Sequence, residues 1–252
     1  MLRLLQRKEK QMSKILAIGD VHAKTWMIYE LSELIDHYDK IVFVGDYADN
    51  WNTPPTHSLS CWRLIRQLMQ QYPDKVHAVI GNHDYAYIHD EIAGRSSGWN
   101  PVTYTLLRTP ENKKIRDWLL SLPAILKLDD VYYSHAGITE EYAPKDEVFD
   151  GTVQGLWSDV SPLWARPAKF GGRVTYKKGY TQVIGHNPSE TIWNPAPDVW
   201  CIDTFSQDQN NNFIGDKSLL EIVDGKEFNI IKLEEIQNEN NNDTSGVEDQ
   251  VS

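Results

Sequence analysis

The sequence predicts an α/β fold built around a mainly parallel sheet, and three observations lead to this prediction. Short apolar runs of the length of buried strands recur along the chain, and segments with apolar residues at helical spacing lie between them. Each of the first three apolar runs also ends in glycine followed by Asp or Asn. Strands that alternate with helices form right-handed βαβ units, and α/β sheets bind ligands at the carboxyl ends of such strands.

The first third of the chain contains three predicted strands, at 14–19, 41–44 and 76–80. Apolar residues at helical spacing predict the two intervening helices, one from Met27 to Tyr38 and the other from Trp62 to Tyr72. The run at 41–44 is apolar without alternation, so we expect this strand to be buried on both faces, and the same pattern of an apolar run that ends in glycine occurs in the other two.

The middle of the chain predicts a loop, a helix and a hairpin. Residues 88–101 contain Gly and Ser and are expected to form a flexible loop near the ligand crevice. Thr109-Pro-Glu111 predicts a helix start, because Pro suits the first helical turn. Two apolar runs, 124–128 and 131–134, are joined by Asp129-Asp130 and predict a hairpin. A hairpin in this half of the chain indicates a second sheet.

The last third contains four more predicted strands, at 181–185, 199–202, 219–223 and 228–233. Asp224-Gly225 between the last two is a strong hairpin signal. Residues 151–179 are rich in Gly, Pro and Trp and show no sustained period. A long irregular segment of this kind is usually functional or else disordered.

Composition bounds the class of protein. At 252 residues and 40% hydrophobic content the chain can bury a sizeable core. The formal net charge is −11, but six acidic residues follow Lys232 without a base, so the rest of the chain is only mildly acidic. This balance gives no strong signal for nucleic-acid binding. Cys61 and Cys201 lack metal-type spacing, which predicts a reduced, cytoplasmic protein.

The two ends of the chain differ from its middle. Residues 1–12 are expected to be a basic N-terminal appendage, with Met12 as the alternative start, and they lack the apolar run of a secretory signal. Residues 13–236 are expected to form the domain, and the acidic, Asn-rich residues 237–252 a disordered tail. No run approaches the roughly 20 apolar residues of a membrane span, so no membrane association is predicted.

The polar residues at the strand ends carry the chemistry. Asp20 and His22 offer an oxygen and an imidazole to one ion, Asp46 can share its carboxylate between two ions, and the residues that can complete the second site are Asn82, His135 and His186. This mixed set suits Mn²⁺, Fe or Zn²⁺ rather than thiolate-binding metals. Two ions roughly 3.5–4 Å apart would clamp a phosphate and turn a bridging water into an attacking hydroxide.

Each of these residues also has an ordinary structural explanation. An Asp after a strand is usually a turn or helix cap, and a single His is usually a satisfied core or surface residue. Five sites with ligand chemistry, all at strand ends, are hard to obtain by chance. The other histidines lack such placement and are expected to be structural: His37, His57, His77 and His89.

Five blocks of the sequence resemble the signature blocks of the calcineurin-like metallophosphoesterases, over about Lys14 to Leu233. They are Gly19-Asp20-Val-His22, Gly45-Asp46-Tyr-Ala-Asp49-Asn50, Gly81-Asn82-His83-Asp84, His135-Ala-Gly137 and Gly185-His186. The resemblance implies the metallophosphoesterase fold, a four-layer α-β-β-α sandwich with a dimetal site at the carboxyl ends of the strands. Many phosphodiesterases of the superfamily carry a second His where this chain has Pro188. The chain is therefore more similar to the phosphoprotein phosphatase branch, which includes bacterial and phage serine/threonine phosphatases and symmetrical diadenosine tetraphosphatases; Asp203-Thr204 also resembles that branch.

The resemblance also implies roles for single residues. One metal would be held by Asp20, His22 and Asp46, and the other by Asp46, Asn82, His135 and His186. His83 would be the general acid, with Asp49 orienting it. The residues themselves agree, because His83 directly follows a ligand and cannot easily share its ion.

The chain departs from the branch at the position that binds substrate phosphate. The branch normally has Arg there, and this chain has Asn50, which can donate a hydrogen bond but brings no charge. Arg166, which resembles a phosphate-contacting Arg of bacterial members, and Arg173 could supply the cation from the irregular segment. The alternative for each is a solvated arginine.

We therefore expect a metal-dependent phosphoesterase that uses two divalent ions, with manganese favoured over iron or zinc. Its substrate would be a phosphomonoester, as for a protein phosphatase, or a nucleotide phosphoanhydride, so the candidates are a phosphoprotein, a dinucleoside polyphosphate and a small nucleotide. One alternative is a phosphodiesterase that acts on cyclic nucleotides or nucleic acid. Another is a catalytically silent binding scaffold.

Overall fold

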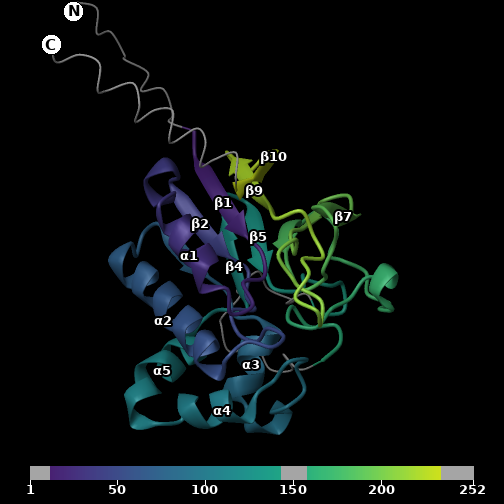
Figure 1. Cartoon of the computed structure of the whole chain (residues 1–252). Helices are drawn as coiled ribbons and strands as arrows, with labels where there is room; N and C mark the ends of the chain where they lie inside the picture. The colour runs from purple at the N-terminus through teal and green to yellow at the C-terminus, as the bar shows by residue number, and fades with distance from the viewer. Residues whose placement is uncertain (1–11, 143–157, 234–252) are drawn as a thin grey trace, which may run out of the picture.

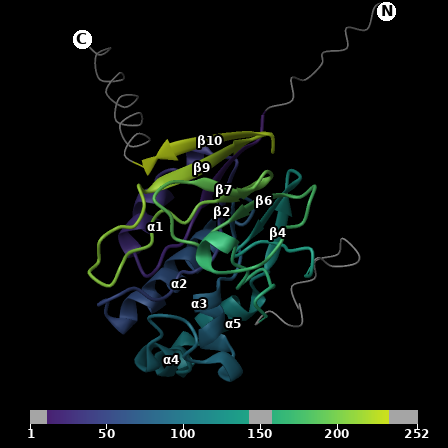
Figure 2. The same ribbon diagram turned by 90° about the vertical axis from the view of Figure 1, so that its right-hand side faces the viewer.

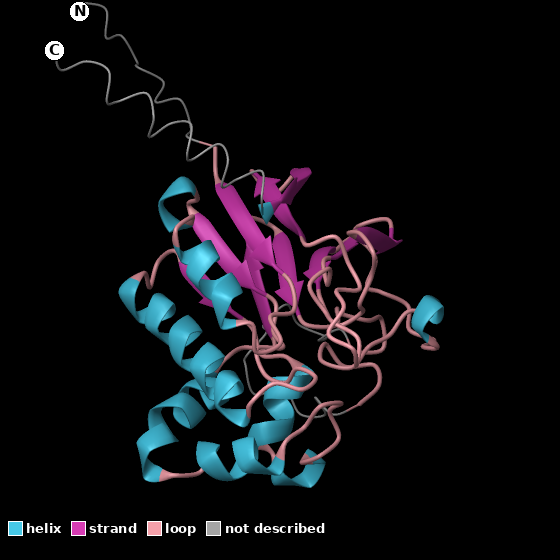
Figure 3. Ribbon diagram, in the orientation of Figure 1, coloured by secondary structure: helices cyan, strands magenta, loops and turns pink. Residues whose placement is uncertain are grey.

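The computed structural model of the chain describes residues 12–142 and 158–233. Two β-sheets pack face to face, and helices lie on the outer side of one of them (Figures 1 and 3). Residues 1–11, the predicted tail 237–252 and the 151–157 part of the irregular segment lie outside the described residues. The division into appendage, domain and tail thus stays a prediction.

The first sheet has the strand order β10-β9-β1-β2-β3. Its bounds are β1 (Lys14–Ile18), β2 (Lys40–Phe43), β3 (Val76–Ala78), β9 (Ser218–Val223) and β10 (Glu227–Lys232). The first three strands are parallel, as predicted, and β9 and β10 add an antiparallel hairpin beside β1. Asp224 and Gly225 form its turn with positive φ angles of 51° and 67°, which confirms the predicted hairpin.

The second sheet has the order β4-β5-β6-β8-β7. Its bounds are β4 (Ile125–Leu128), β5 (Val131–Ser134), β6 (Thr181–Ile184), β7 (Trp193–Ala196) and β8 (Val199–Cys201). The central β5, β6 and β8 are parallel, and β4 and β7 are antiparallel edges. Asp129 and Asp130 turn with φ angles of 48° and 65°, as a two-residue type I′ hairpin requires.

The two-sided burial expected of the parallel strands follows from the layers. Along β1, Ile15 and Ala17 pack in the core between the sheets, while Leu16 and Ile18 pack in the core beneath the helices. All four side chains are fully buried. Alternate residues of one strand thus join two different cores, and both must be apolar.

The helices lie on the outer side of the first sheet and beyond the ends of its strands (Figure 1). They are α1 (Thr25–Ser32), α2 (Pro55–Gln71), α3 (Asn82–Ile88), α4 (Pro101–Leu107) and α5 (Lys113–Ser121). Short 3-10 turns occur at Ile35–His37, Asp90–Ile92, Pro110–Asn112 and Ala168–Phe170. The predicted first helix is thus α1 followed by the 3-10 turn at Ile35–His37. The predicted loop at 88–101 contains the 3-10 turn at Asp90–Ile92.

Irregular chain lies on the outer side of the second sheet in the described part of the molecule. Tyr176 packs there against Ile184, Val199 and Cys201. Figure 2 views this side and shows the loops of the segment and its 3-10 turn in front of the strands. The α/β class and the two facing sheets are confirmed, and the fourth layer is irregular chain in the described ranges.

Candidate metal centre

Polar side chains from both sheets meet at the carboxyl ends of the parallel strands. Asp20 follows β1, Asp46 follows β2 and Asn82 follows β3, while His135 follows β5 and His186 follows β6. All five are buried. A cavity of about 340 Å³ opens beside them, and its lining includes Asp20, Asp46 and His186. The structure therefore brings the strand-end residues of the two sheets to one place.

The glycines that precede these residues make the close approach possible. A Cβ atom on Gly81 would lie 2.2 Å from Oδ1 of Asp46, and one on Gly185 would lie 2.0 Å from Oδ1 of Asp20. Each glycine thus leaves room for a carboxylate that belongs to a different loop. This explains why glycine comes directly before polar residues in the blocks of the sequence.

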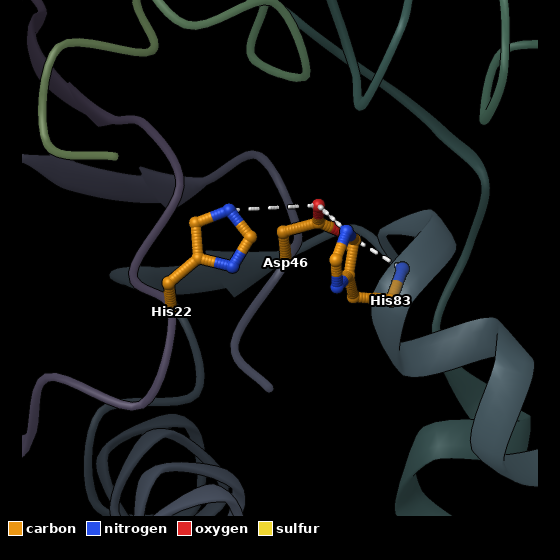
Figure 4. A group of neighbouring side chains, drawn as sticks. All are labelled: His22, Asp46 and His83. Atoms are coloured by element: carbon orange, nitrogen blue, oxygen red, sulfur yellow. Dashed lines mark hydrogen bonds and ion pairs between the residues drawn. The ribbon is translucent and has the colours of Figure 1, made fainter. Parts of the chain in front are cut away.

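Asp46 lies at the centre of the cluster. Its Oδ2 atom is 3.3 Å from Nε2 of His135, 3.8 Å from Nε2 of His83 and 3.9 Å from Nε2 of His22. Figure 4 shows His22 and His83 on either side of its carboxylate. Asp46 has a φ of 55°, in the left-handed region that costs energy for residues other than glycine. It belongs to both groups of side chains that could hold an ion, namely His22 with His83 and His135 with His186.

A tight group of ligand atoms lies on one side of Asp46. The Nε2 atom of His135 is 2.8 Å from Oδ1 of Asn82 and 3.1 Å from Nδ1 of His186, which is itself 2.9 Å from the Asn82 oxygen. On the other side, Nε2 of His22 lies 3.7 Å from Oδ2 of Asp20. The side chains assigned to the two ions from the sequence thus lie around Asp46, and their role as metal ligands stays a prediction.

The chemistry of these donors fits divalent cations. Nδ1 of His135 lies 3.0 Å from the Val44 carbonyl oxygen, which can only accept, so this nitrogen carries the proton. Nδ1 of His22 likewise donates to the carbonyls of Ala48 and Asp49, both at 3.0 Å. In the neutral His22 ring, Nε2 is then a lone pair that lies 3.7 Å from the Asp20 carboxylate and 3.9 Å from the Asp46 carboxylate. A cation placed among these nitrogen and oxygen atoms would bind them and remove their mutual repulsion. Backbone carbonyls fix the orientation of the two rings, as they do for metal-binding histidines.

Burial shifts the pKa of the ligands in the direction that metal binding requires. It lowers the pKa of His22 to about 3 and that of His186 well below its ordinary value, so both imidazoles are neutral. Burial would raise the pKa of Asp46, but the nearby His135 and His83 outweigh it and hold the pKa low. For Asp20, burial and the charges of Asp203 and Asp46 raise the pKa, so this carboxylate needs a cation to stay ionised at low cost.

His83 lies beside these groups at the start of α3. Its Nδ1 is 3.0 Å from Oδ2 of Asp49. Tyr87 Oη donates to Oδ1 of the same carboxylate, and Ser96 Oγ donates to Oδ2 at 3.2 Å. Burial lowers the pKa of His83, but the charges of Asp46 and Asp49 and the hydrogen bond to Asp49 outweigh it and raise the pKa to about 9. The ring lines the cavity, so a protonated imidazole faces it.

The three residues expected to contact phosphate are placed differently. Arg166 lines the cavity, and its Nη1 donates to the His186 carbonyl at 3.4 Å and to Asn187 Oδ1 at 3.3 Å. Asn50 also lines it, and its amide donates to Gln207 Oε1 at 2.8 Å. Arg173 is exposed and lies outside the lining of this cavity, although it shares a neighbouring cavity with Arg166.

Two acidic residues of the site received no role from the sequence. Asp84 is fully buried and accepts from the backbone N–H groups of Tyr47, Ala48 and Gly81 and from Trp62 Nε1. It ties the loop after β2 to the loop after β3. Its spacing of three residues after Gly81 is that of a capping-box acid, a signal present in the sequence.

Asp203 follows β8 and lines the cavity. It is buried, and neither carboxylate oxygen has a hydrogen-bond partner in the described part of the chain. Burial raises its pKa to about 6, and the charge of Asp46 acts in the same direction. The charge of the buried Lys24 acts in the opposite direction, so the Asp203 carboxylate already has one cation of the protein near it. By contrast, the four histidines expected to be structural do not line the cavity.

Comparisons with known proteins agree with this geometry. The sequence profile of the family described as calcineurin-like phosphoesterase matches residues 13–236. A "Probable serine/threonine-protein phosphatase" of Encephalitozoon cuniculi is 25% identical over 190 residues, covering 68% of this chain and 38% of that protein. A symmetrical bis(5'-nucleosyl)-tetraphosphatase of Janthinobacterium is 24% identical over 225 residues, covering 75% of this chain and 78% of that enzyme. The chain thus spans little more than a third of the first relative.

Among solved structures, a protein serine/threonine phosphatase from Saccharomyces cerevisiae with similarity to human phosphatase PP5 has the same fold. The TM-score is 0.55 at 15% identity, with 83% of this chain and 72% of that one covered. Within the described residues, none of the helices has the length and apolar character of a membrane span.

Proposed function

Because this chain belongs to the calcineurin-like phosphoesterase family, and is therefore a hydrolase acting on phosphate esters, we propose that it cleaves phosphomonoesters or nucleotide phosphoanhydrides at the cavity beside Asp46. The observation that carries the proposal is the position of the Asp46 carboxylate between His22, whose Nε2 is 3.9 Å from its Oδ2, and His135, whose Nε2 is 3.3 Å from the same oxygen. One shared carboxylate is what a pair of ions requires when both must act on the same phosphate.

We assign Asp20, His22 and Asp46 to one ion, and Asp46, Asn82, His135 and His186 to the other. When bound, the two divalent ions supply Lewis acidity toward phosphate oxygens and lower the pKa of water to produce the nucleophile. The oxygen and nitrogen donors favour manganese, with iron or zinc as alternatives.

His83 is proposed as the general acid. Its Nδ1 is bound by Asp49, so its Nε2 is free to deliver a proton to the leaving oxygen of a phosphate in the cavity. Asp49 positions the ring and is itself held by Tyr87 and Ser96. A positioned imidazole contributes typically 10²–10⁴-fold to the rate.

Arg166 is proposed as the phosphate-binding cation. Two acceptors hold its Nη1, and the side chain still lines the cavity. Asn50, at the position where the branch has Arg, is tied to Gln207 and contributes at most a neutral hydrogen bond. A fixed positive charge beside the two metal ions suits a monoester or a terminal phosphoanhydride better than the two metal ions alone would.

The phosphodiesterase alternative is disfavoured by Pro188, which lines the cavity at the position where many diesterases of the superfamily have a further His. The silent-scaffold alternative is disfavoured because the sequence retains His83 and every residue that we assign to the two ions. A cytoplasmic location is proposed because Cys61 and Cys201 are both free thiols.

Hydrolysis of p-nitrophenyl phosphate and of bis(p-nitrophenyl) phosphate in the presence of Mn²⁺ tests the proposal. We expect the monoester to be cleaved faster, and activity to disappear in Asp46→Asn. Faster cleavage of the diester would favour the phosphodiesterase alternative. No cleavage of either compound with Mn²⁺, Fe²⁺ or Zn²⁺ would favour the scaffold.

A further inference from the structure

A second cavity, of about 460 Å³, lies on the other side of Arg166. Its lining includes Asp159, Trp164, Arg166, Phe170, Gly172 and Arg173. They belong to the irregular segment on the outer side of the second sheet. None of the steps proposed above uses this cavity.

The walls of the second cavity combine aromatic surface with positive charge. Trp164 and Phe170 supply the rings, and Arg166 and Arg173 supply two guanidinium groups against the single carboxylate of Asp159. Lys169 lies next to this wall, with its Nζ 5.5 Å from the centre of the Phe170 ring. The cavity therefore suits a ligand that is both flat and anionic.

Arg166 joins the second cavity to the metal centre, because its side chain lines both. Its Nη1 is held by the His186 carbonyl and by Asn187 Oδ1, so the guanidinium lies beside a candidate metal ligand. The Trp164 ring also meets the His186 ring edge to face, with centres 6.4 Å apart. A phosphate at the metal centre and a ring in the second cavity would thus be separated by one side chain.

The wall beside Arg166 is closely packed. A Cβ on Gly172 would lie 1.6 Å from the Arg166 carbonyl oxygen, so only glycine allows this approach of the loop to Arg166. Gly171 has a φ of 79° and ends the 3-10 turn that carries Phe170. The two glycines thus place Phe170 and Arg173 on either side of a turn that faces Arg166.

We infer that the second cavity binds the nucleoside part of a nucleotide substrate, with its base against Trp164 and Phe170 and a non-scissile phosphate at Arg173. This inference rests on the proposed function and narrows its substrate to nucleoside phosphates. Aromatic side chains stack on bases, and one arginine guanidinium can bind two phosphate oxygens at once. Ligand cavities of a few hundred Å³ with apolar walls and few polar groups are typical of small-molecule sites.

The test compares a substrate that reaches the second cavity with one that does not. Diadenosine tetraphosphate carries a base that can reach the second cavity, whereas inorganic phosphate and an alkyl phosphate such as glycerol 2-phosphate carry no ring and need only the metal centre. We expect Phe170→Ala to raise the KM for diadenosine tetraphosphate roughly 5- to 100-fold, the effect of losing one stacked base. Arg173→Gln should raise it roughly threefold to tenfold, because the residue is exposed. Phe170→Leu, which keeps the apolar bulk but not the ring, should resemble Phe170→Ala.

Hydrolysis of the alkyl phosphate by the same variants should stay within about twofold of wild type. Lys178→Gln is the matched control, because it removes one exposed charge from the same segment outside the lining of the cavity. A parallel loss of activity on both substrates would show that Phe170 only supports the fold, and an unchanged KM for diadenosine tetraphosphate would overturn the inference. The inference would also be overturned if the enzyme selectively cleaved a phosphopeptide and neither Phe170→Ala nor Arg173→Gln changed the rate of that cleavage.

Binding of ADP, measured by calorimetry on the full chain, examines the cavity apart from catalysis. We expect ADP to bind at least tenfold more tightly than inorganic phosphate, and Phe170→Ala to remove this difference. Equal affinities in the wild-type protein would contradict the nucleoside site even if the enzyme is an active phosphatase. Tight ADP binding by a protein that cleaves no phosphate ester would uphold the cavity and contradict the proposed function, so the two failures can be told apart.

Discussion

The Nδ1 atom of His83 lies 3.0 Å from Oδ2 of Asp49, while its Nε2 atom lies 3.8 Å from Oδ2 of Asp46. The imidazole thus lies between the carboxylate of Asp49, which we assign to neither ion, and that of Asp46, which we assign to both. Since Tyr87 and Ser96 also bind Asp49, the ring is held in one orientation. His83 can therefore be replaced without removing any of the proposed metal ligands.

Replacing His83 by Ala should leave both metal sites intact and slow turnover. The loss should reach roughly 10²–10⁴-fold for an alkyl phosphate, whose leaving oxygen needs a proton, and be smaller for p-nitrophenyl phosphate. Turnover numbers and bound metal are measured on the same preparations. Asp49→Asn, which weakens the orientation but keeps the ring, is the control and should show a smaller loss. Equal losses on the two substrates would mean that His83 is not the general acid.

The metal-free protein should lose stability as the pH rises past the neutral range. The folded-state pKa of His83 is raised to about 9, mainly by the charge of Asp46 against the effect of burial. A raised pKa stabilises the fold fully below the unfolded value of about 6.5, and the contribution is lost as the pH approaches 9. We expect a decrease of roughly 1–3 kcal/mol in the free energy of unfolding over this window.

Urea unfolding in the presence of a chelator measures this pH dependence, with His83→Gln as the comparison. The variant should show a flatter profile between about pH 6.5 and pH 9. If the wild-type and variant profiles are parallel, His83 does not carry the raised pKa.

Arg166→Ala should lower kcat/KM for p-nitrophenyl phosphate by roughly 1.5–3 kcal/mol, the range for a hydrogen bond to a charged group. The reason is that Arg166 supplies a fixed positive charge to the lining of the metal cavity, close to His186. Arg173→Ala is the paired control and should be silent on this small substrate, since Arg173 lies outside that lining. A silent Arg166→Ala would leave the phosphate-binding cation unassigned.

Asn50→Arg should raise kcat/KM for a monoester severalfold, because it adds a cation to the lining of the cavity. Gln207 Oε1, which accepts from the Asn50 amide at 2.8 Å, can also accept from a guanidinium. Asn50→Ala removes the contact without adding charge and is the control for the loss of the link to Gln207. If Asn50→Arg slows monoester hydrolysis and Arg166→Ala has no effect, the hypothesis of a monoester substrate is wrong. A diester or anhydride substrate is then favoured.

Asp84→Ala should destabilise the fold by roughly 2–4 kcal/mol. Four buried donors lose their acceptor, among them Trp62 Nε1 at 2.7 Å. Asp90→Ala is the control, because Asp90 is exposed and its contacts with Arg108 and Tyr104 are worth little. Thermal unfolding of the metal-free proteins compares the two, and equal melting temperatures would contradict the role given to Asp84.

The strands that end at the site could be predicted because their cause is local. A strand such as β1 lies between two apolar cores, so Ile15 to Ile18 are all apolar, and the polar residue that the site uses, Asp20, comes in the loop that follows. The edge strand β7 was not predicted, because Trp193-Asn-Pro-Ala196 has no apolar run and Pro is tolerated only where a ladder hydrogen bond is absent. The helix α4 begins at Pro101, where the sequence predicts the end of a loop.

Contacts between distant loops could not be predicted from the sequence. Asn50 and Gln207 are 157 residues apart, and nothing near either residue indicates that they meet. Arg166 and Arg173 have similar surroundings in the sequence, yet only Arg166 lines the metal cavity, because the turn at Ala168–Phe170 lies between them. Asp84 carried a local capping signal, but the three other donors that it binds come from elsewhere.

Calorimetric titration of the metal-free protein with Mn²⁺, on wild type and on Asp46→Asn, tests the central claim most directly. Asp46 lies between the two groups of ligand atoms, so one substitution should weaken both sites together. We expect two ions per wild-type chain, and a variant that binds neither ion tightly and has lost its activity. His37→Ala, far from the cavity, should behave as wild type. A variant that still binds two ions tightly would contradict the bridging role of Asp46 and with it the proposed centre.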